Sequence, residues 1–88
     1  MRLDKFLKVS RLIKRRTLAK GICTRGQVTL NGRVAKAGAE VKPGDVITIN
    51  FGSRSLKLEV CALRENIPVK MATDLYRVLK DEKITSEG

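Results

Sequence analysis

Basic side chains that could bind phosphate are concentrated between residues 11 and 21 of this 88-residue chain. The planar guanidinium of arginine can bind a phosphate through two parallel hydrogen bonds. Cations crowded together without acids repel one another, and an anionic partner would relieve that repulsion. The segment therefore predicts a binding surface for a polyanion. It reads RLIKRRTLAKG, it holds no acid and no histidine, and its cations are Arg11, Lys14, Arg15, Arg16 and Lys20.

The whole positive excess of the chain lies in its first part. The formal net charge is +10, and residues 1–36 hold eleven Lys and Arg against one acid, Asp4. Residues 37–88 hold eight charges of each sign. Such a one-sided field suits nucleic acid or an anionic membrane surface. We expect no membrane partner, because the N-terminal segment lacks Trp and its modest apolar face is needed for the core.

The chain offers little for catalysis or metal binding. It has no histidine, its acids are scattered, and it has no glycine-rich phosphate loop. We expect no enzyme activity, no cofactor and no metal site. Cys23 and Cys61 lie 38 positions apart and form no C-x-x-C pair. We expect both to be buried and reduced, although the sequence leaves a disulfide between them open. No apolar segment follows Met1, so we expect no signal peptide and a cytoplasmic location.

Aromatic side chains that could stack on bases are few. They are Phe6, Phe51 and Tyr76, and both phenylalanines fall on expected core faces. Proteins that bind single-stranded RNA normally use such side chains as stacking platforms. We therefore expect contacts with phosphates, 2′-hydroxyls and the shape of folded RNA.

Two short helices are expected to present the cations. Residues 3–14 show helical spacing of apolar residues, and Asp4, Lys8, Arg11 and Arg15 form a second, outer stripe. Asp4 lies in the first turn, where a negative charge is favoured, and it precedes Lys8 by four positions, as in a helical ion pair.

The second helix is expected over residues 17–25. Thr17 is its expected N-cap, and Gly26 follows it as a left-handed C′ residue. Gly21 costs this helix roughly 1 kcal/mol relative to alanine. A close approach by another helix or by RNA would account for it. The inner face is expected to hold Leu18 and Ile22, with Ala19 and Cys23 beside them.

The periodicity then changes to that of strands. Asn31-Gly32 predicts a hairpin between residues 27–30 and 33–36. Pro43-Gly44-Asp45 predicts a turn, and residues 47–51 and 56–60 alternate as half-buried strands. Residues 69–83 are expected to form a helix with an apolar stripe of Met71, Leu75, Val78 and Leu79. The fold class is thus α+β: two helices on a small twisted antiparallel sheet, plus a C-terminal helix.

Residues 2–49 resemble the S4 RNA-binding domain family. The resemblance is carried by RLDKFL, by Arg16-Thr17 with Ala19, by GQVTLNG and by Gly44-Asp45. It departs from the family pattern at Arg15, where many members have serine. The resemblance implies an S4 domain over residues 1–63, with 64–88 as a linker and helical extension. It also implies RNA binding by Arg2 and Arg16, with Asp4 orienting the surface.

The full length resembles small stand-alone S4 proteins of bacterial ribosome-associated quality control. That resemblance implies binding to a stalled large ribosomal subunit that carries peptidyl-tRNA, with contacts to 23S ribosomal RNA and the tRNA. It further implies support of C-terminal alanine tailing by RqcH, and a monomer. The alternative is ribosome recycling of the heat-shock protein 15 type. The expected RNA-binding residues are Arg2, Asp4, Lys8, Arg11, Lys14, Arg15, Arg16, Thr17, Lys20, Arg25, Asn31, Arg33 and Lys36.

Overall fold

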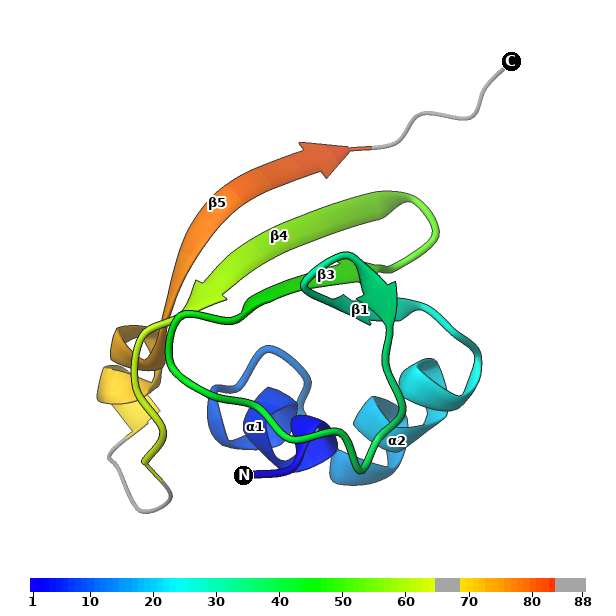
Figure 1. Cartoon of the computed structure of the whole chain (residues 1–88). Coiled ribbons are helices and arrows are strands. Elements are labelled where there is room, and N and C mark those ends of the chain that lie inside the picture. The colour runs from blue at the N-terminus through cyan, green and yellow to red at the C-terminus, as the bar shows by residue number, and fades with distance from the viewer. Residues whose placement is uncertain (65–68, 84–88) are drawn as a thin grey trace.

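Two helices cover one face of a five-stranded antiparallel sheet in the computed structural model of the chain (Figure 1). The structure describes residues 1–64 and 69–83. The strand order is β2-β1-β3-β4-β5. These features confirm the expected helix pair and sheet. The elements are α1 (Leu3–Val9), α2 (Arg16–Thr24), β1 (Val28–Leu30), β2 (Arg33–Val34), β3 (Val46–Asn50), β4 (Arg54–Val60), a 3₁₀-helix η1 (Val69–Leu75) and β5 (Tyr76–Lys83).

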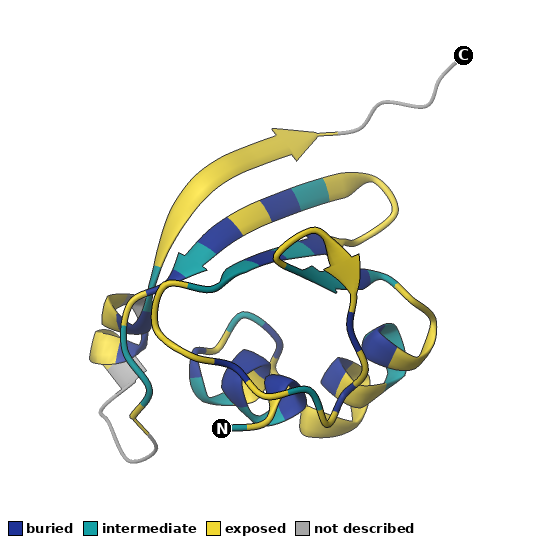
Figure 2. Cartoon of the chain, in the orientation of Figure 1, coloured by how far each residue is buried: buried dark blue, intermediate teal, exposed yellow. Residues whose placement is uncertain are grey.

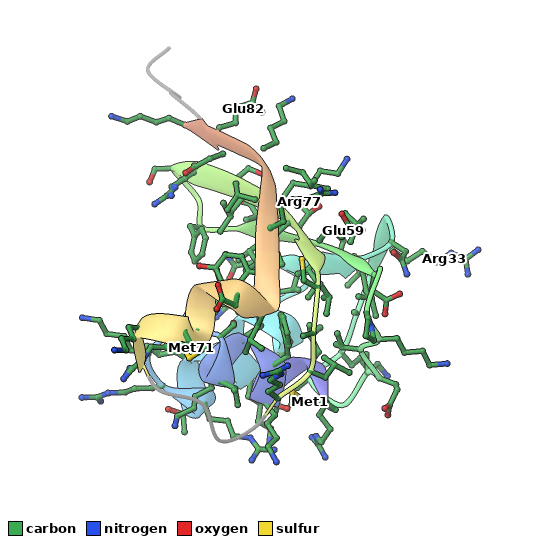
Figure 3. All side chains as sticks on the ribbon, turned by 90° about the vertical axis from the view of Figure 1, so that its left-hand side faces the viewer. Met1, Arg33, Glu59, Met71, Arg77 and Glu82 are labelled. Carbon is green, nitrogen blue, oxygen red and sulfur yellow. The ribbon has the colours of Figure 1, made fainter. Side chains whose placement is uncertain are left out.

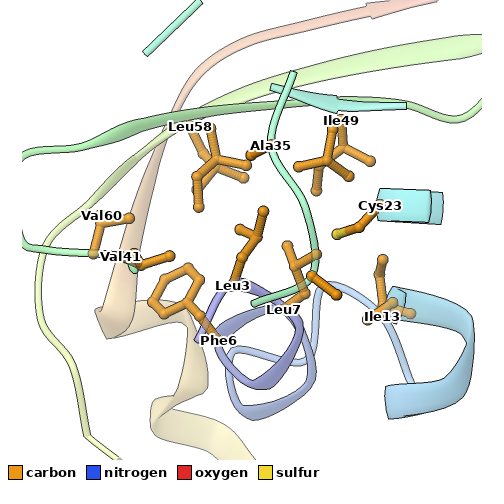
Figure 4. Close-up of a cluster of buried hydrophobic side chains, with 14 of the residues drawn as sticks. Leu3, Phe6, Leu7, Ile13, Cys23, Ala35, Val41, Ile49, Leu58 and Val60 are labelled. Carbon is orange, nitrogen blue, oxygen red and sulfur yellow. The ribbon is translucent and has the colours of Figure 1, made fainter. Parts of the chain in front are cut away.

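The hydrophobic core lies between the helices and the inner face of the sheet (Figures 2 and 4). From α1, Leu3, Phe6 and Leu7 are fully buried. They face Ile49 of β3 and Leu58 of β4, since alternate residues of each strand point to the same side. Among the residues that the structure describes, no helix covers the other face of the sheet (Figure 1). One face of the sheet therefore fixes the helix pair, and with it the N-terminal cations.

Helix α1 is shorter than the expected 3–14. It ends at Val9, with Ser10 as its C-cap and Arg11 in the left-handed region at φ 63°. Ile13 nevertheless reaches the core, and its backbone N–H bonds to the carbonyl of Leu7. The apolar periodicity thus continued beyond the helix because a turn after Ser10, not a further helical turn, carries Ile13 into the core.

Helix α2 starts at Arg16, one residue before the expected start. Its N-cap residue is Arg15, in extended conformation and without a side-chain capping bond, so the expected N-cap role of Thr17 was wrong. Ala19 and Cys23 face the core as expected, but Leu18 is 56% exposed. The small side chains face inward because α2 packs closely against α1. Gly26 has φ 75° and confirms the expected left-handed C′ position.

The Asn31-Gly32 hairpin is confirmed, with positive φ at both residues. The amide of Asn31 also joins the hairpin to the next strand. Its Oδ1 accepts a 2.9 Å bond from the N–H of Val46, and its Nδ2 donates a 3.1 Å bond to Asp45. The turn at residues 43–45 is confirmed by Gly44 at φ 94° and by the bond from Asp45 N–H to the Lys42 carbonyl.

The expected C-terminal helix was wrong. Only residues 69–75 are helical, as a 3₁₀-helix, and residues 76–83 form strand β5 along the edge of β4. Leu75 is buried, whereas Met71, Val78 and Leu79 are 40–48% exposed. Without β5, the edge of the seven-residue β4 would leave N–H and C=O groups without partners. Pairing with this edge therefore determines the structure of residues 76–83, although their apolar residues have helical spacing. Most of the expected linker, residues 65–68, lies outside the described residues.

Two further core assignments were wrong. Phe51 is 41% exposed, because it leaves β3 and enters the turn in which its N–H bonds to the Arg54 carbonyl. Cys61 is exposed, while Cys23 is buried, and both are free thiols. No helix in residues 1–64 and 69–83 has the length and apolar character needed to cross a membrane.

Candidate nucleic-acid interface

A buried carboxylate lies between two arginines at the start of both helices. The Asp4 side chain is 3% exposed, and its Oδ1 and Oδ2 lie 3.4 Å from Nε of Arg2 and Nε of Arg16, respectively. The two arginine side chains remain 55% and 52% exposed. The expected pairing of Asp4 with Lys8 is replaced by this arrangement. Asp4 therefore orients the guanidinium groups without removing them from solvent.

The backbone around Asp4 is held by the segment at residues 37–41. The N–H groups of Leu3 and Asp4, in the first turn of α1, donate to the carbonyls of Ala39 and Ala37. The N-terminal amine lies 2.9 Å from Glu40 and lowers the pKa of that carboxyl by hydrogen bonding and charge. These contacts fix the direction in which Arg2 leaves the chain. A side chain at Gly38 would lie against its guanidinium.

Arg2, Asp4 and Arg16 line a shallow depression of about 300 Å³ together with Thr17 and Lys20. Thr17 and Lys20 follow Arg16 on the first turns of α2, so all three residues come from one helix end. Three cations thus surround an open hollow that has a single acid in its lining. The geometry suits a phosphate group, because guanidinium and ammonium groups converge on solvent there.

The other expected cations are exposed but are spread over the surface. Lys8, Arg11, Lys14 and Arg15 lie on α1 and the segment that joins it to α2, and Arg25 lies at the end of α2. Arg33 extends from the hairpin away from the body (Figure 3). Asn31 is also exposed, but both atoms of its amide are used in the fold by Val46 and Asp45. The structure thus gathers Arg2, Asp4, Arg16, Thr17 and Lys20, and distributes the rest.

A second hollow, of about 400 Å³, was not anticipated, and its lining includes Gly38, which lies next to Arg2 of the first hollow. We call it the α2 groove. The end of α2 forms one wall, and the segment after β2 forms the other. These walls come together only through tertiary contact. The sequence therefore indicated the groove through no more than Lys36, Gly26 and Gly38. Its lining includes Cys23, Thr24, Gly26, Val34, Lys36 and Gly38.

Three of the five cations on the β4–β5 ribbon are paired with acids. Arg54 donates two hydrogen bonds to Asp81, which lowers the pKa of that carboxyl. Arg77 lies beside Glu59 on the neighbouring strand, and Lys80 lies 3.7 Å from Glu82 (Figure 3). These three pairs neutralise six of the eight charges on the ribbon and leave Lys57 and Lys83. Most of the unbalanced positive charge thus lies on the helices and the hairpin.

Comparison with known proteins gives a consistent family. The S4 domain model matches residues 1–47. A protein of Halalkalibacterium halodurans named RQC P-site tRNA stabilizing factor is 54% identical over 85 residues, covering 97% of both chains. Its namesake in Bacillus subtilis is 50% identical, covering 96% of this chain and 98% of that protein. The trimeric structure of Vibrio cholerae heat shock protein 15 superposes with a TM-score of 0.82 at 32% identity, over 89% of this chain and 80% of that one. The chain therefore belongs to the S4 domain family and to the family of these P-site tRNA stabilizing factors.

Proposed function

We propose that this chain is a non-catalytic RNA-binding factor of bacterial ribosome quality control. The observation that carries the proposal is the cluster of Arg2, Asp4 and Arg16, in which a buried acid directs two half-exposed guanidinium groups to one hollow. The names of relatives that are about half identical over nearly the whole chain support the same role. The ligand in this proposal is a large ribosomal subunit that still holds a tRNA.

The cluster would act by fixing the RNA backbone. Arg2 and Arg16 would bind phosphate oxygens, and Lys20 would add a third charge at the same hollow. Phosphate contacts position a protein on RNA but carry little sequence information. The exposed Lys8, Arg11, Lys14, Arg15, Arg25, Arg33 and Lys36 would extend the field along the helices and the hairpin.

The full proposal names the partners of the complex. The protein would act in the cytoplasm as a monomer and contact 23S ribosomal RNA and peptidyl-tRNA. By holding the tRNA on the subunit, it would support addition of C-terminal alanine tails by RqcH. The chain's small size suits a factor that stabilises a complex while its partners perform the chemistry.

A second candidate function is ribosome recycling of the heat-shock protein 15 type. The observation that favours it is the fold shared with that protein at 32% identity. The two functions differ in the state of the subunit. A stabilizing factor should bind subunits with peptidyl-tRNA more tightly than subunits stripped of tRNA. Equal binding to both would favour the second candidate.

The test is co-sedimentation of the purified protein with bacterial large subunits that carry peptidyl-tRNA. We expect Arg2→Ala and Arg16→Ala to lower the bound fraction at least tenfold at physiological salt. Lys57→Ala is the matched control, because it removes the same charge from an exposed position on β4. Wild-type binding by both arginine variants would overturn the proposed surface. A reconstituted tailing reaction with RqcH then tests the partner.

A further inference from the structure

We propose that the α2 groove receives an unpaired nucleobase of the RNA whose backbone lies on Arg2 and Arg16. The inference rests on the proposed function and adds a second site to it. The site is the hollow of about 400 Å³ between the end of α2 and residues 34–38. Its volume falls within the roughly 300–1,000 Å³ of small-ligand pockets, so it has room for a single base.

Hydrogen bonds hold both walls of the groove in place. On the helix side, Gly26 N–H bonds to the Cys23 carbonyl and closes the end of α2. On the other side, Ala35 N–H bonds to Val28 in β1, and the Ala37 carbonyl accepts from Asp4 N–H. A β-carbon at Gly26 would lie only 3.7 Å from Val34, so the walls meet closely there. The groove therefore needs little rearrangement to take a ligand.

The groove continues directly from the arginine cluster. Gly38 lies in its wall, and a β-carbon there would be 3.6 Å from a guanidinium nitrogen of Arg2. Lys20 lines the depression at the arginines, and its carbonyl accepts a 2.9 Å bond from the Thr24 hydroxyl, which lines the groove. One nucleotide can thus place its phosphate at Arg2 while its base enters the groove.

The chemistry of the groove favours a base over a protein side chain. Its floor is apolar, with Cys23 buried beneath it, while Thr24 and Lys36 place polar groups at the rim. A base needs that combination, since it has an apolar face and a polar edge. The described exposed surface offers Phe51 as its one phenylalanine, on a turn after β3. A base that leaves its stack therefore has no aromatic platform beside the cluster, but it has a pocket.

The experiment is ultraviolet crosslinking of the protein to large subunits that carry peptidyl-tRNA, followed by mass spectrometry of peptide–nucleotide adducts. Such zero-length crosslinks form only between a base and the side chain it touches. We expect adducts in residues 23–26 or 34–38. Thr24→Leu fills the groove without offering an aromatic ring, and it should lower those adducts on the order of tenfold, as expected for losing about 1.4 kcal/mol of contact.

Thr48→Leu is the matched control, because it makes the same change on the sheet face that carries no helix. It should leave the adducts unchanged. Val34→Ala, at a residue that is 66% exposed, removes part of a wall without a core cavity and should also lower them. Three outcomes would overturn this inference but not the proposed function. They are co-sedimentation without groove adducts, groove adducts that persist in Thr24→Leu, and a protein crosslinked at the groove instead of RNA. If the wild-type protein did not co-sediment with large subunits, both this inference and the proposed function would be overturned.

Discussion

Oδ2 of Asp4 lies 3.4 Å from Nε of Arg16, and this contact joins the first turn of α1 to the first turn of α2. The same carboxylate reaches Arg2 through its other oxygen, which is buried and has no hydrogen-bond partner among the described residues. A buried carboxylate normally accepts several hydrogen bonds. Asp4 is therefore shared between two cations that both stay available to solvent, and its geometry serves their orientation.

Replacing Asp4 by asparagine separates orientation from net charge. The substitution adds one positive charge to the surface, so electrostatics alone would raise RNA affinity. We expect affinity for large subunits to fall several-fold, because Arg2 and Arg16 lose their common partner. In a double-mutant cycle on unfolding, Asp4→Asn and Arg16→Ala should couple by about 0.5–1 kcal/mol, because the arginine of this pair stays half exposed to solvent. Tighter binding by Asp4→Asn would show that its role is only to reduce charge.

The salt dependence of binding counts the phosphate contacts. If about five cations reach phosphates, log K should fall against log salt with a slope of about −4 to −4.5, a loss of several hundred-fold between 50 and 200 mM. We expect Arg16→Ala to make the slope shallower by about one, and Lys57→Ala to leave it unchanged. Titration of labelled protein with large subunits at four salt concentrations measures both. A slope near zero would contradict a phosphate interface.

Local signals predicted most of the fold correctly. The Asn31-Gly32 turn needs positive φ at two positions, which few residue pairs provide, so the hairpin was readable from two letters. The alternation in β3 was equally readable, because Ile47 and Ile49 are buried on one face. The periodicity of apolar residues predicted the wrong buried face for α2, where packing against α1 determines which side chain is buried. Leu18 and Ala19 are neighbours on α2, and the close contact with α1 selects the smaller one for the core.

The candidate site was predictable in composition but not in geometry. The charge distribution pointed to Arg16, and the family resemblance pointed to Arg2, Asp4 and Arg16. Neither indicates that Asp4 is buried, since that depends on residues 37–41 packing over the start of α1. The α2 groove depends on the same packing, which places Gly38 beside Arg2. Contacts between segments more than 30 positions apart leave no periodic trace in the sequence.

Gly21 gives a test of how closely RNA approaches α2. Apart from the neighbouring backbone of α2 itself, a β-carbon at this position would meet no atom of the described residues within 4 Å, so the helix–helix approach considered from the sequence is not the reason for the glycine. We expect Gly21→Ala to stabilise the free protein by about 1 kcal/mol, raising Tm by roughly 4–8 °C. Thermal unfolding checks this. A lower Tm would show a constraint on the backbone at this point, and weaker subunit binding by the stabilised variant would indicate contact with RNA.

Leu75 and Leu79 test whether residues 76–83 form a strand or a helix. A helical stripe would bury both, but Leu75 is 1% exposed and Leu79 is 44% exposed on β5. We expect Leu75→Ala to lower the free energy of unfolding by about 2–4 kcal/mol, since it leaves a cavity. Leu79→Ala should cost less than about 1 kcal/mol. Urea denaturation measures the loss in free energy of unfolding for both variants. Equal losses would favour the helix expected over residues 69–83.

The Cys23 thiol predicts how stability changes at alkaline pH. Burial, with a smaller contribution from the charge of Asp4, raises the pKa of Cys23 from 9.0 to about 11. In the unfolded chain the thiol ionises above its lower pKa, while the folded protein keeps it protonated. Its contribution to stability is therefore constant below pH 9 and is lost as the pH rises from 9 toward 11. We expect the urea midpoint of the wild type to fall more steeply over this range than that of Cys23→Ala, because the two proteins differ only in this thiol. Parallel curves would mean that the thiol ionises as readily in the folded protein as in the unfolded chain.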